Sequence, residues 1–577
     1  MDRKGIIAIS LAVLVLFIWQ LEFAPKYMPP AAAPGASPAG SPAPSATAGV
    51  TSGGSPANPA NPAAIAGPVP SATPEVKVPE TLTAVPGPAG TYHFTNLGGG
   101  IARVQLGGYA AESGSSVTLN EFGTLPIGAI SEQPMEGADL PYTVTQQGNA
   151  VLCVRDQPGG LSISKKFTLP SSVAAALGYG LTLDITYTNH GAGTLQSPGY
   201  YMYVGSATPI HQRDLTIYTA FDWDVAGAKS THTTVNDFNA RRVPLIGIEL
   251  SPEKKEYTAD ADKIGWAAIN SQFFTTIVAP QNGTAGIGVW ADRFPVKSDD
   301  RDVMAIEGAL RMPAFSLPPG GSVTQSFNIY AGPKIYDVLK GLGEGQQQIL
   351  NFGLFTPVSV FLLRMMNLLF LVTHSYAISI IILTLCIRGI LWPVQNRATA
   401  SMRQMQEIQP RMAELKEKYK DDPTRMNTEV MKLYKEYKIN PLAGCLPMFI
   451  QMPIFFGFYR LLGTAIELRG SRFLWVHDLS QPDTVFHIAG VPINILPICM
   501  AITMIMQMRL QPKTGDQAQQ RMFMFLPLIF VFICYNFASA LALYYTVQNI
   551  FSITQLYVTR KKTAPAPVTM PVKRRSR

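Results

Sequence analysis

The stretch that decides the fold is Tyr376–Val394, which reads YAISIIILTLCIRGILWPV. It is close to the ~20 predominantly apolar residues that a helix needs to cross a bilayer. The stretch carries a single charge, Arg388, and Thr384 lies one turn before it on the same helical face. Because an arginine at the centre of a membrane helix costs about 2.5–3.5 kcal/mol on insertion, we expect this one to have a specific reason to be there.

Two explanations for Arg388 are open at this stage. It lies roughly six residues, or about 9 Å of helical rise, from the expected cytoplasmic end, so its apolar stem can carry the charge to water. Alternatively, it faces a wet cavity inside a helical bundle. Gln451, Tyr544 and Tyr545 lie in later apolar segments and are candidates to line the same cavity. Such residues also bond neighbouring membrane helices with no further role.

Five further apolar segments have the length of a membrane span or nearly so, which predicts six transmembrane helices. They are residues 1–24, Pro441–Gly463, Val491–Met508, the shorter Met522–Tyr535, and Ala538–Val558, with the last two divided near Asn536. Residues 1–24 are interpreted as an uncleaved signal anchor, although Ala31–Ala33 would also suit cleavage of a signal peptide. Residues 352–374 are amphipathic and are predicted to lie along the outer interface.

Basic residues gather in three loops that predict the orientation. The chain has a net charge of +8, and the segment 395–440 alone holds ten Lys and Arg. The loop 509–521 and the tail 559–577 are also basic. Because basic loops stay in the cytoplasm, both termini are predicted to be cytoplasmic and the large polar region outside. This pattern indicates a multi-pass membrane protein with a large domain outside the cytoplasm.

The polar region 91–335 has the pattern of an all-β domain. Leu181, Leu183, Ile185 and Tyr187 alternate with polar residues, as in a half-buried strand. Glycine- and proline-rich turns recur between such runs. About 240 residues of short strands predict a large sandwich. Residues 25–90 are rich in Pro, Ala, Gly and Ser and are predicted to form a disordered linker.

The segment 395–440 is predicted to be a cytoplasmic helical hairpin. Met412 and Leu415 belong to one apolar stripe, and Leu433 and Tyr434 belong to a second. Asp422 followed by Pro423 is typical of an N-cap with proline at the first helical position. Either the two stripes pack against each other in a solvated pair, or the hairpin is a mobile flap that receives a partner.

The motifs of several classes of enzyme are missing from the sequence. It contains no Walker A motif, dinucleotide-binding fingerprint, GxSxG or HExxH. Its five cysteines show no CxxC spacing, and four of them fall in apolar segments. We therefore expect no enzyme activity, catalytic residues, cofactor, metal or nucleotide.

The motifs resemble those of the YidC membrane protein insertases, relatives of the mitochondrial Oxa and thylakoid Alb proteins. The resemblance is strongest within 376–558 and rests on Asn440–Pro447, Gln451–Phe455, Glu467–Arg469, Trp475–Leu479, Ile387–Gly389 and Leu543–Tyr545. Two further pairs resemble sequence in the periplasmic domain of the Gram-negative members of this family: Gly265-Trp266 and Phe273-Phe274.

The resemblance implies a five-helix insertase core (376–558) with a hydrophilic groove open to the cytoplasm and to lipid. Arg388, Thr384, Gln451 and Tyr545 match positions of that substrate groove, and residues 91–335 match a periplasmic β-supersandwich. The implied partners are nascent membrane proteins, the lipid bilayer, the Sec translocon and, through the basic tail, the ribosome. The implied function is insertion and chaperoning of integral membrane proteins, alone or with the Sec translocon.

Two rival functions remain at this stage. A secondary transporter would use Arg388 as an anion site, but such proteins usually show internal repeats, and none is evident in the sequence. A sugar-acting enzyme in the β-domain would need a set of histidines and carboxylates. His93, His190, His211 and His232 lie there in no obvious pattern.

Overall fold

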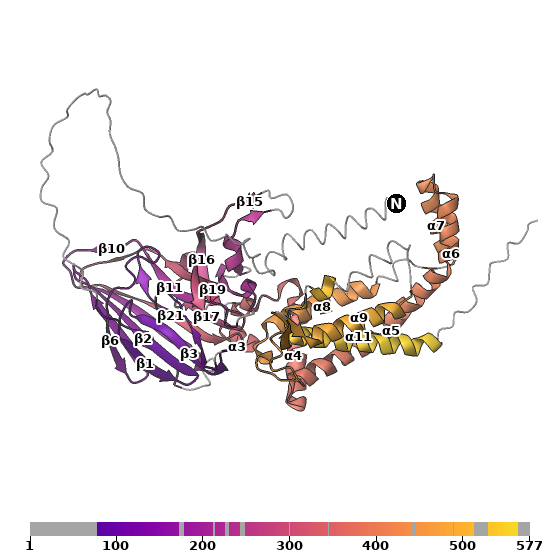
Figure 1. Cartoon of the computed structure of the whole chain (residues 1–577). Helices are drawn as coiled ribbons and strands as arrows, with labels where there is room; N and C mark the ends of the chain where they lie inside the picture. The colour runs from indigo at the N-terminus through magenta and orange to yellow at the C-terminus, as the bar shows by residue number, and fades with distance from the viewer. Residues whose placement is uncertain are drawn as a thin grey trace, which may run out of the picture.

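A computed structural model of the chain describes residues 78–112, 114–171, 178–211, 214–225, 230–242, 249–298, 301–343, 345–437, 439, 446–488, 490–512, 529–532 and 534–562. The predicted N-terminal anchor, most of the linker, most of Asn440–Pro447, and most of Met522–Tyr535 lie outside these residues. So do most of the loop 509–521 and the tail beyond Lys562. A β-domain and a helical bundle lie end to end (Figure 1).

The β-domain is built on one large sheet and several small ones. The 13-stranded sheet follows the order β5-β11-β19-β18-β16-β17-β21-β9-β8-β7-β6, with β12 and β13 paired beside β16. Its strands are β5 (Ile130–Ser131), β6 (Thr143–Gln147), β7 (Ala150–Asp156), β8 (Leu161–Thr168), β9 (Gly180–Asn189), β11 (Tyr200–Ala207), β12 (Ala220–Val225), β13 (Thr231–Thr234), β16 (Glu256–Asn270), β17 (Phe274–Pro280), β18 (Gly286–Ser298), β19 (Arg301–Met312) and β21 (Ser322–Pro333). Leu181, Leu183, Ile185 and Tyr187 all point inward from β9, which confirms the predicted alternation.

Smaller sheets complete this part of the chain. A four-stranded sheet contains β1 (Leu82–Gly87), β2 (Gly90–Thr95), β3 (Gly100–Ala110) and β4 (Ser116–Leu119). Two-stranded sheets pair β10 (Leu195–Ser197) with β20 (Phe315–Leu317), and β14 (Arg241–Arg242) with β15 (Glu249–Ser251). The all-β class predicted for this domain is confirmed.

The start of the β-domain corrects the predicted linker 25–90. Strand β1 begins at Leu82 and pairs along its length with β2, while Val85 is fully buried. The proline-rich composition predicted a linker. However, β1 is the edge strand of its sheet and is hydrogen-bonded to one neighbour only, so it tolerates Pro86, which has no backbone N–H. The ordered domain therefore starts before residue 91.

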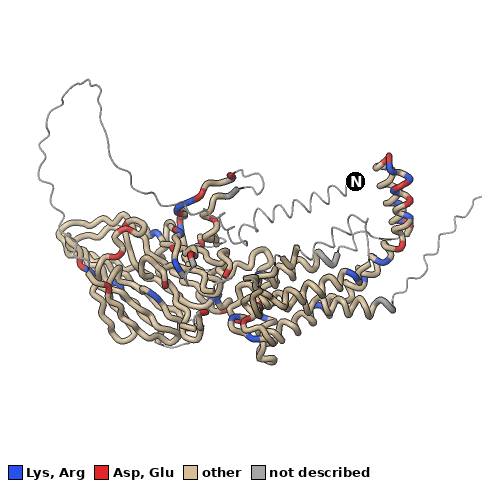
Figure 2. The backbone as a smooth tube through the Cα atoms, viewed as in Figure 1, with Lys and Arg blue, Asp and Glu red and all other residues tan. Residues whose placement is uncertain are grey.

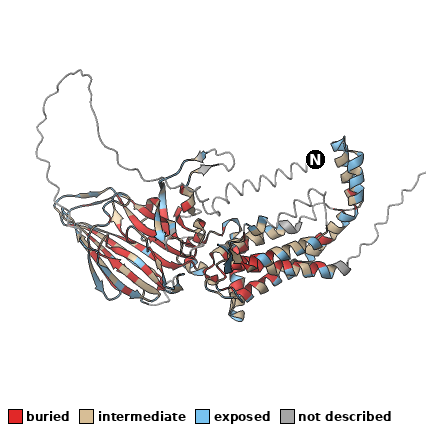
Figure 3. Ribbon diagram, viewed as in Figure 1, coloured by how far each residue is buried: buried red, intermediate tan, exposed pale blue. Residues whose placement is uncertain are grey.

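The helical part contains α3 (Tyr336–Gly341), α4 (Thr356–Thr373), α5 (Tyr376–Glu407), α6 (Gln409–Lys418), α7 (Pro423–Glu436), α8 (Leu446–Thr464), α9 (Ile495–Leu510) and α11 (Ser539–Lys562). Helix α11 packs on α5 and α9, and α4 packs on α5 and α8. One apolar core runs without interruption from the β-domain through Leu339 and Phe352 into this bundle. Buried residues accordingly continue across the junction (Figure 3).

Within the described residues, two helices are long and apolar enough to cross a membrane by length and composition: Gly353–Thr373 and Tyr376–Glu407. The first overlaps the segment 352–374, so its interfacial placement stays a prediction. A shorter apolar helix spans Ile495–Leu510. The number of six spans likewise stays a prediction.

Two predicted boundaries in the bundle can be compared with the structure. The fourth predicted span, Val491–Met508, is wrong at its start, since Val491–Asn494 forms β23 against β22 (Thr484–Ile488) and α9 begins only at Ile495. Pro492, which has no backbone N–H, and Asn494, a residue suited to an N-cap, favour this late start. The break predicted near Asn536 is confirmed, because α11 begins at Ser539.

The predicted hairpin 395–440 begins later than expected. Helix α5 continues through Pro393 to Glu407, so the hairpin consists of α6 and α7 and their flanking residues. Asp422 caps α7 by accepting a hydrogen bond from the Arg425 N–H, which confirms the predicted start. Ile408, Leu433 and Ile439 form a small core with Met412 and Leu415, so the two stripes pack against each other. The pair is rich in charge and lies at the end of the bundle farthest from the β-domain (Figures 1 and 2).

Candidate functional site: the polar interior of the bundle

Arg388 lies on α5, the helix whose sequence first pointed to it, and is half-buried. Its charge lies within electrostatic reach of the hydroxyl groups of Tyr544 and Tyr545 on α11. Within the part of the chain that the structure describes, its guanidinium forms no hydrogen bond and no ion pair. The guanidinium is always charged and has five N–H donors, and none of them has a protein partner among these residues.

Thr384 is completely buried one turn before Arg388. Its Oγ1 donates a hydrogen bond of 2.6 Å to the carbonyl oxygen of Ile380 in the same helix. The next residue, Leu385, is exposed on the outside of the bundle, as is Ile390. Helix α5 therefore has an interior face that carries Thr384 and an apolar exterior face.

Gln451 on α8 is fully engaged with α11. Its Nε2 donates to Tyr544 Oη and to Gln548 Oε1, both at 3.1 Å. The ring of Tyr544 also stacks on Phe458, with centroids 4.3 Å apart. These contacts join two helices, which is the bonding role that the sequence left open as an alternative to lining a cavity.

Tyr545 lies in an aromatic cluster rather than in a hydrogen-bond network. It is buried, and its ring centroid lies 5.1 Å from that of Phe530 and 5.6 Å from that of Phe455. Both contacts have edge-to-face geometry, which suits aromatic packing. The structure thus brings Arg388, Tyr544 and Tyr545 together, with Gln451 attached through Tyr544.

Sequence reasoning missed a polar stripe that continues along α11. Its further members are Gln548, Asn549, Ser552 and Gln555, all of them buried. The stripe from Tyr544 to Gln555 covers eleven residues of helical rise, roughly 16 Å. The signal was present, because polar residues at intervals of three and four on a membrane helix mark an interior face.

The stripe is mostly satisfied by neighbouring helices. Gln555 Nε2 donates to Asn396 Oδ1 (2.8 Å) on the far part of α5, and Asn549 Nδ2 donates to Thr503 Oγ1 (3.2 Å) on α9. Ser552 Oγ donates to the carbonyl of Gln548. Arg388 therefore differs from its polar neighbours, since it is charged and has no partner among the described residues.

The described residues contain no cluster that could hold a metal in this region. No group of three or more His, Cys, Asp or Glu within them could hold a metal ion. The interior instead presents hydroxyl, amide and guanidinium groups beside an apolar exterior. Such a surface can bind and solvate a polar peptide segment, while an apolar segment stays outside it.

The β-domain holds two histidine–aspartate pairs that the sequence did not reveal. His232 Nδ1 lies 2.5 Å from Asp222 Oδ1, and His211 Nδ1 lies 3.3 Å from Asp214 Oδ1. A cavity of about 440 Å³ in the same domain is lined by residues such as Asn149, Thr182, Asn328 and Tyr330. Because no histidine or carboxylate lines this cavity, it gives no support to a sugar-acting enzyme.

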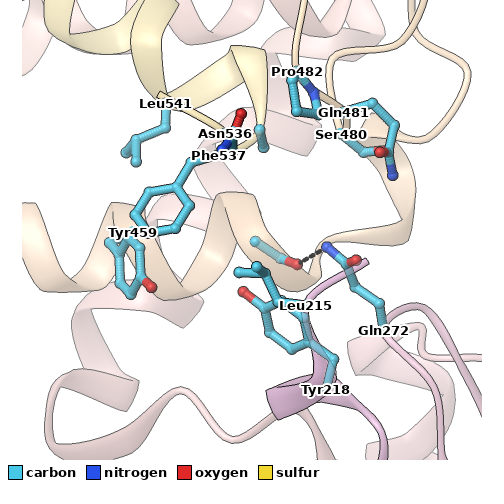
Figure 4. Close-up of a pocket in the computed structure, with 12 residues that line it drawn as sticks. Leu215, Tyr218, Gln272, Tyr459, Ser480, Gln481, Pro482, Asn536, Phe537 and Leu541 are labelled. Atoms are coloured by element: carbon cyan, nitrogen blue, oxygen red, sulfur yellow. Dashed lines mark hydrogen bonds between the residues drawn. The ribbon is translucent and has the colours of Figure 1, made fainter. Parts of the chain in front are cut away.

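The Glu467–Arg469 motif lies at the junction of the two parts. Arg469 Nη2 donates to the carbonyl of Ala110 (2.6 Å), and its guanidinium lies 5.3 Å from the centre of the Phe274 ring. Burial raises the pKa of the Glu467 carboxyl. Gln272 Nε2 also donates to the carbonyl of Gly463 (2.8 Å) beside a small pocket between Tyr218 and Tyr459 (Figure 4). The motif therefore fixes the β-domain on the end of the bundle.

Comparison with known proteins gives matches along most of the chain. Residues 93–365 match the family described as YidC periplasmic domain, and residues 368–566 match the family described as 60Kd inner membrane protein. The membrane protein insertase YidC of Syntrophus aciditrophicus is 30% identical, with 97% of this chain and all of the relative aligned. That of Geobacter metallireducens is also 30% identical, with 98% and 99% aligned. A solved structure described as an active YidC insertase aligns with 84% of this chain and 93% of its own, at 18% identity and a TM-score of 0.33.

Proposed function

The chain belongs to the family of YidC membrane protein insertases, and we propose that it inserts integral membrane proteins into the bacterial inner membrane and assists their folding. It acts alone or together with the Sec translocon, without enzyme chemistry. In this proposal the chain has six membrane spans, of which five form the insertase core, and both termini are cytoplasmic. The β-domain (to residue 335) is periplasmic.

The observation that carries the proposal is the state of Arg388. A permanent cation inside a helical bundle is normally paired or bonded, because an unpartnered charge in low dielectric is unfavourable. Arg388 has no such partner within the described residues, while Thr384, Gln451 and Tyr545 are engaged close by. We assign these four residues to a substrate groove in which the arginine supplies the charge that binds a passing segment.

The mechanism follows from two separate surfaces. A polar or acidic segment of the substrate enters the groove from the cytoplasm, attracted by Arg388 in a medium of low dielectric. This segment then has a shorter apolar distance to cross. The substrate's apolar helix meanwhile moves along the exposed faces of α5 and α9 into lipid. The membrane potential assists outward movement of negative charge by ~2.3 kcal/mol per charge per 100 mV.

Cytoplasmic partners would meet the basic elements. The α6–α7 pair, which mixes basic and acidic residues, lies at the end of the bundle opposite the β-domain (Figure 2), and the tail (559–577) is basic in sequence. A polybasic tail binds ribosomal RNA through its phosphates, and the same charge also binds anionic lipid. Delivery of a nascent chain by the ribosome would place it beside the open end of the groove.

The test uses purified protein in proteoliposomes and substrates with either acidic or neutral translocated segments, scored by protease protection. Arg388→Ala is expected to reduce insertion of the acidic substrates about 10-fold, equivalent to about 1.4 kcal/mol, and Arg388→Lys is expected to be milder. Arg403→Ala, which removes an arginine of the same helix outside the groove, is the matched control and should insert both substrates normally. Equal insertion by wild type and Arg388→Ala for every substrate would overturn the proposal. Saturable uptake of small anions without insertion would favour the transporter.

A further inference from the structure

An apolar hairpin projects from the outer end of the bundle. This external hairpin consists of β22 (Thr484–Ile488) and β23 (Val491–Asn494), and Ile488 pairs with Val491 at its tip. Four of its apolar side chains are exposed, among them Phe486 at 50% and Ile488 at 58%. The sequence from Thr484 to Ile493 contains no Asp, Glu, Lys or Arg. Contiguous exposed apolar surface of this kind marks a binding surface.

The external hairpin leads directly into an apolar helix. Its last residue, Asn494, is the N-cap of α9, so no linker separates the strand from the apolar helix. A strand of four or five residues reaches at most about 15 Å. Because the headgroup layer on each side of a bilayer is about 5–8 Å thick, the tip lies at headgroup depth when the hairpin is inclined toward the membrane and at most about 10 Å above it when upright.

Polar and apolar groups are segregated within this loop. The base of the hairpin is bonded: Tyr535 Oη donates to the carbonyl of Pro492 (2.7 Å), and Asn494 Nδ2 donates to the carbonyl of Tyr535 (2.7 Å). Asp483 Oδ2 accepts from the Leu496 N–H (2.6 Å) and from Trp475 Nε1 (3.0 Å). A fixed polar base thus lies under a tip whose exposed side chains are apolar except for His487.

The apolar surface of the hairpin continues into that of α9. Ile498, Ile502 and Met506 are exposed at intervals of four residues, which places them on one face of this helix. An exposed apolar face on a membrane helix faces lipid. Since the hairpin leads into α9 without a break, its exposed apolar side chains are followed directly along the chain by this exposed apolar face.

We propose that the external hairpin lies in the headgroup region of the outer leaflet, with Phe486 and Ile488 inserted toward the acyl chains. The pairing of β22 with β23 satisfies the backbone groups that face each other. The backbone groups on the two outer edges need water, which is available in the headgroup region but not in the bilayer core. This contact with lipid goes beyond the proposed insertase function and does not depend on Arg388.

The test measures the depth of a spin label in the full chain, free of cysteine, in nanodiscs of phosphatidylethanolamine and phosphatidylglycerol. A nitroxide at Phe486→Cys, with Ile488→Cys as a second site, is expected to show a ratio of oxygen to nickel-chelate accessibility several-fold above the control. The control is Gln147→Cys at the end of β6, an exposed position beside the two-residue turn of the β6–β7 hairpin.

Two outcomes would overturn the proposal. Accessibility to the nickel chelate equal to that of the Gln147→Cys label would place the hairpin tip in water. Exclusion of both oxygen and the chelate would show that protein, rather than lipid, covers the tip.

Discussion

Lys165 in the β-domain and Arg388 in the helical bundle are two cations held in opposite ways. Lys165 in the β-domain is completely buried, and its Nζ donates to the carbonyl oxygens of Gly98 (2.7 Å) and Gly128 (2.9 Å). It also lies 4.6 Å from the centre of the Tyr142 ring. Arg388 in the bundle is half-buried, and the described residues give it neither a hydrogen bond nor an ion pair.

The difference is the one expected between a structural cation and the ligand-binding cation that we propose. Gly98 and Gly128 both have positive φ values, 74° and 84°, so Lys165 joins two loops whose backbones only glycine adopts easily. Its burial lowers the lysine pKa to about 7, which means that the amine can serve as a neutral donor. An arginine cannot lose its proton in this way. Arg388 therefore keeps its charge without a partner among the described residues, which is the state expected of a group that binds a substrate.

The largest effect is expected for Lys165→Met. Two buried carbonyls lose their donor, and an unsatisfied buried group costs about 1–3 kcal/mol, so the β-domain should lose about 3 kcal/mol of unfolding free energy. Urea unfolding of the full chain, followed by fluorescence of Trp223, Trp266 and Trp290, measures this. Lys166→Met on the outward face of the same strand is the control and should change little. Equal stability of the two variants would remove the contrast with Arg388.

The pH dependence of the same domain comes next. The folded pKa of Lys165, about 7, lies below the value of 10.5 for an exposed lysine, so between these values the unfolded chain binds more protons. The free energy of unfolding should therefore increase by about 2 kcal/mol when the pH is raised from 7 to 9. Lowering the pH back to 7 should remove this gain. Lys334, whose burial lowers its pKa to about 8, contributes with the same sign. In Lys165→Met the free energy of unfolding should depend much less on pH over this range. An unchanged pH dependence would show that other groups cause it.

A smaller effect of opposite sign is expected for Arg388→Leu. With no partner to lose, the bundle should gain on the order of 1 kcal/mol, because the cost of holding the charge in the bundle disappears. Thermal unfolding in nanodiscs measures the change. Arg403→Leu is the comparison, since Arg403 Nη1 donates to the carbonyl of Thr559 (3.3 Å) and its removal should bring no gain. A clear loss of stability in Arg388→Leu would mean that Arg388 is structural, as Lys165 is.

The smallest effect concerns Gln451 and Gln548. Hydrogen bonds between membrane helices are worth about 0.6 kcal/mol on average in double-mutant cycles, so Gln451→Leu and Gln548→Leu should be coupled by about this amount. Unfolding of the two single variants and the double variant in nanodiscs gives the coupling energy. Strict additivity would indicate that Gln451 is free to bind substrate rather than engaged with α11.

Much of this architecture could be predicted because the signals are local. The alternation in β9, the cap at Asp422 and the break before α11 depend on residues within a turn or two of each other. The start of β1 and the hairpin at Val491 could not be predicted in this way. Both depend on pairing with another strand, which outweighs the proline-rich or apolar composition of the segment itself.

The candidate site shows the same limit. Arg388 was evident from the sequence because a charge in an apolar helix is costly wherever it points. Whether Gln451 faced a cavity or a neighbouring helix depended on Tyr544 and Gln548, which lie more than ninety residues further along the chain. The stripe along α11 had a recognisable period, but its partners on α5, α8 and α9 emerge only when the helices are packed.

The most direct test of the central claim is photocrosslinking of a nascent substrate arrested during insertion. One variant carries the photoreactive residue at Thr384 on the interior face of α5, and its control carries it at Leu385 on the exterior face. The account predicts that the polar segment of the substrate crosslinks to position 384, that its apolar helix crosslinks to position 385, and that Arg388→Ala abolishes only the first product. Identical crosslinks at both positions, or a product at position 384 that is indifferent to Arg388, would contradict it.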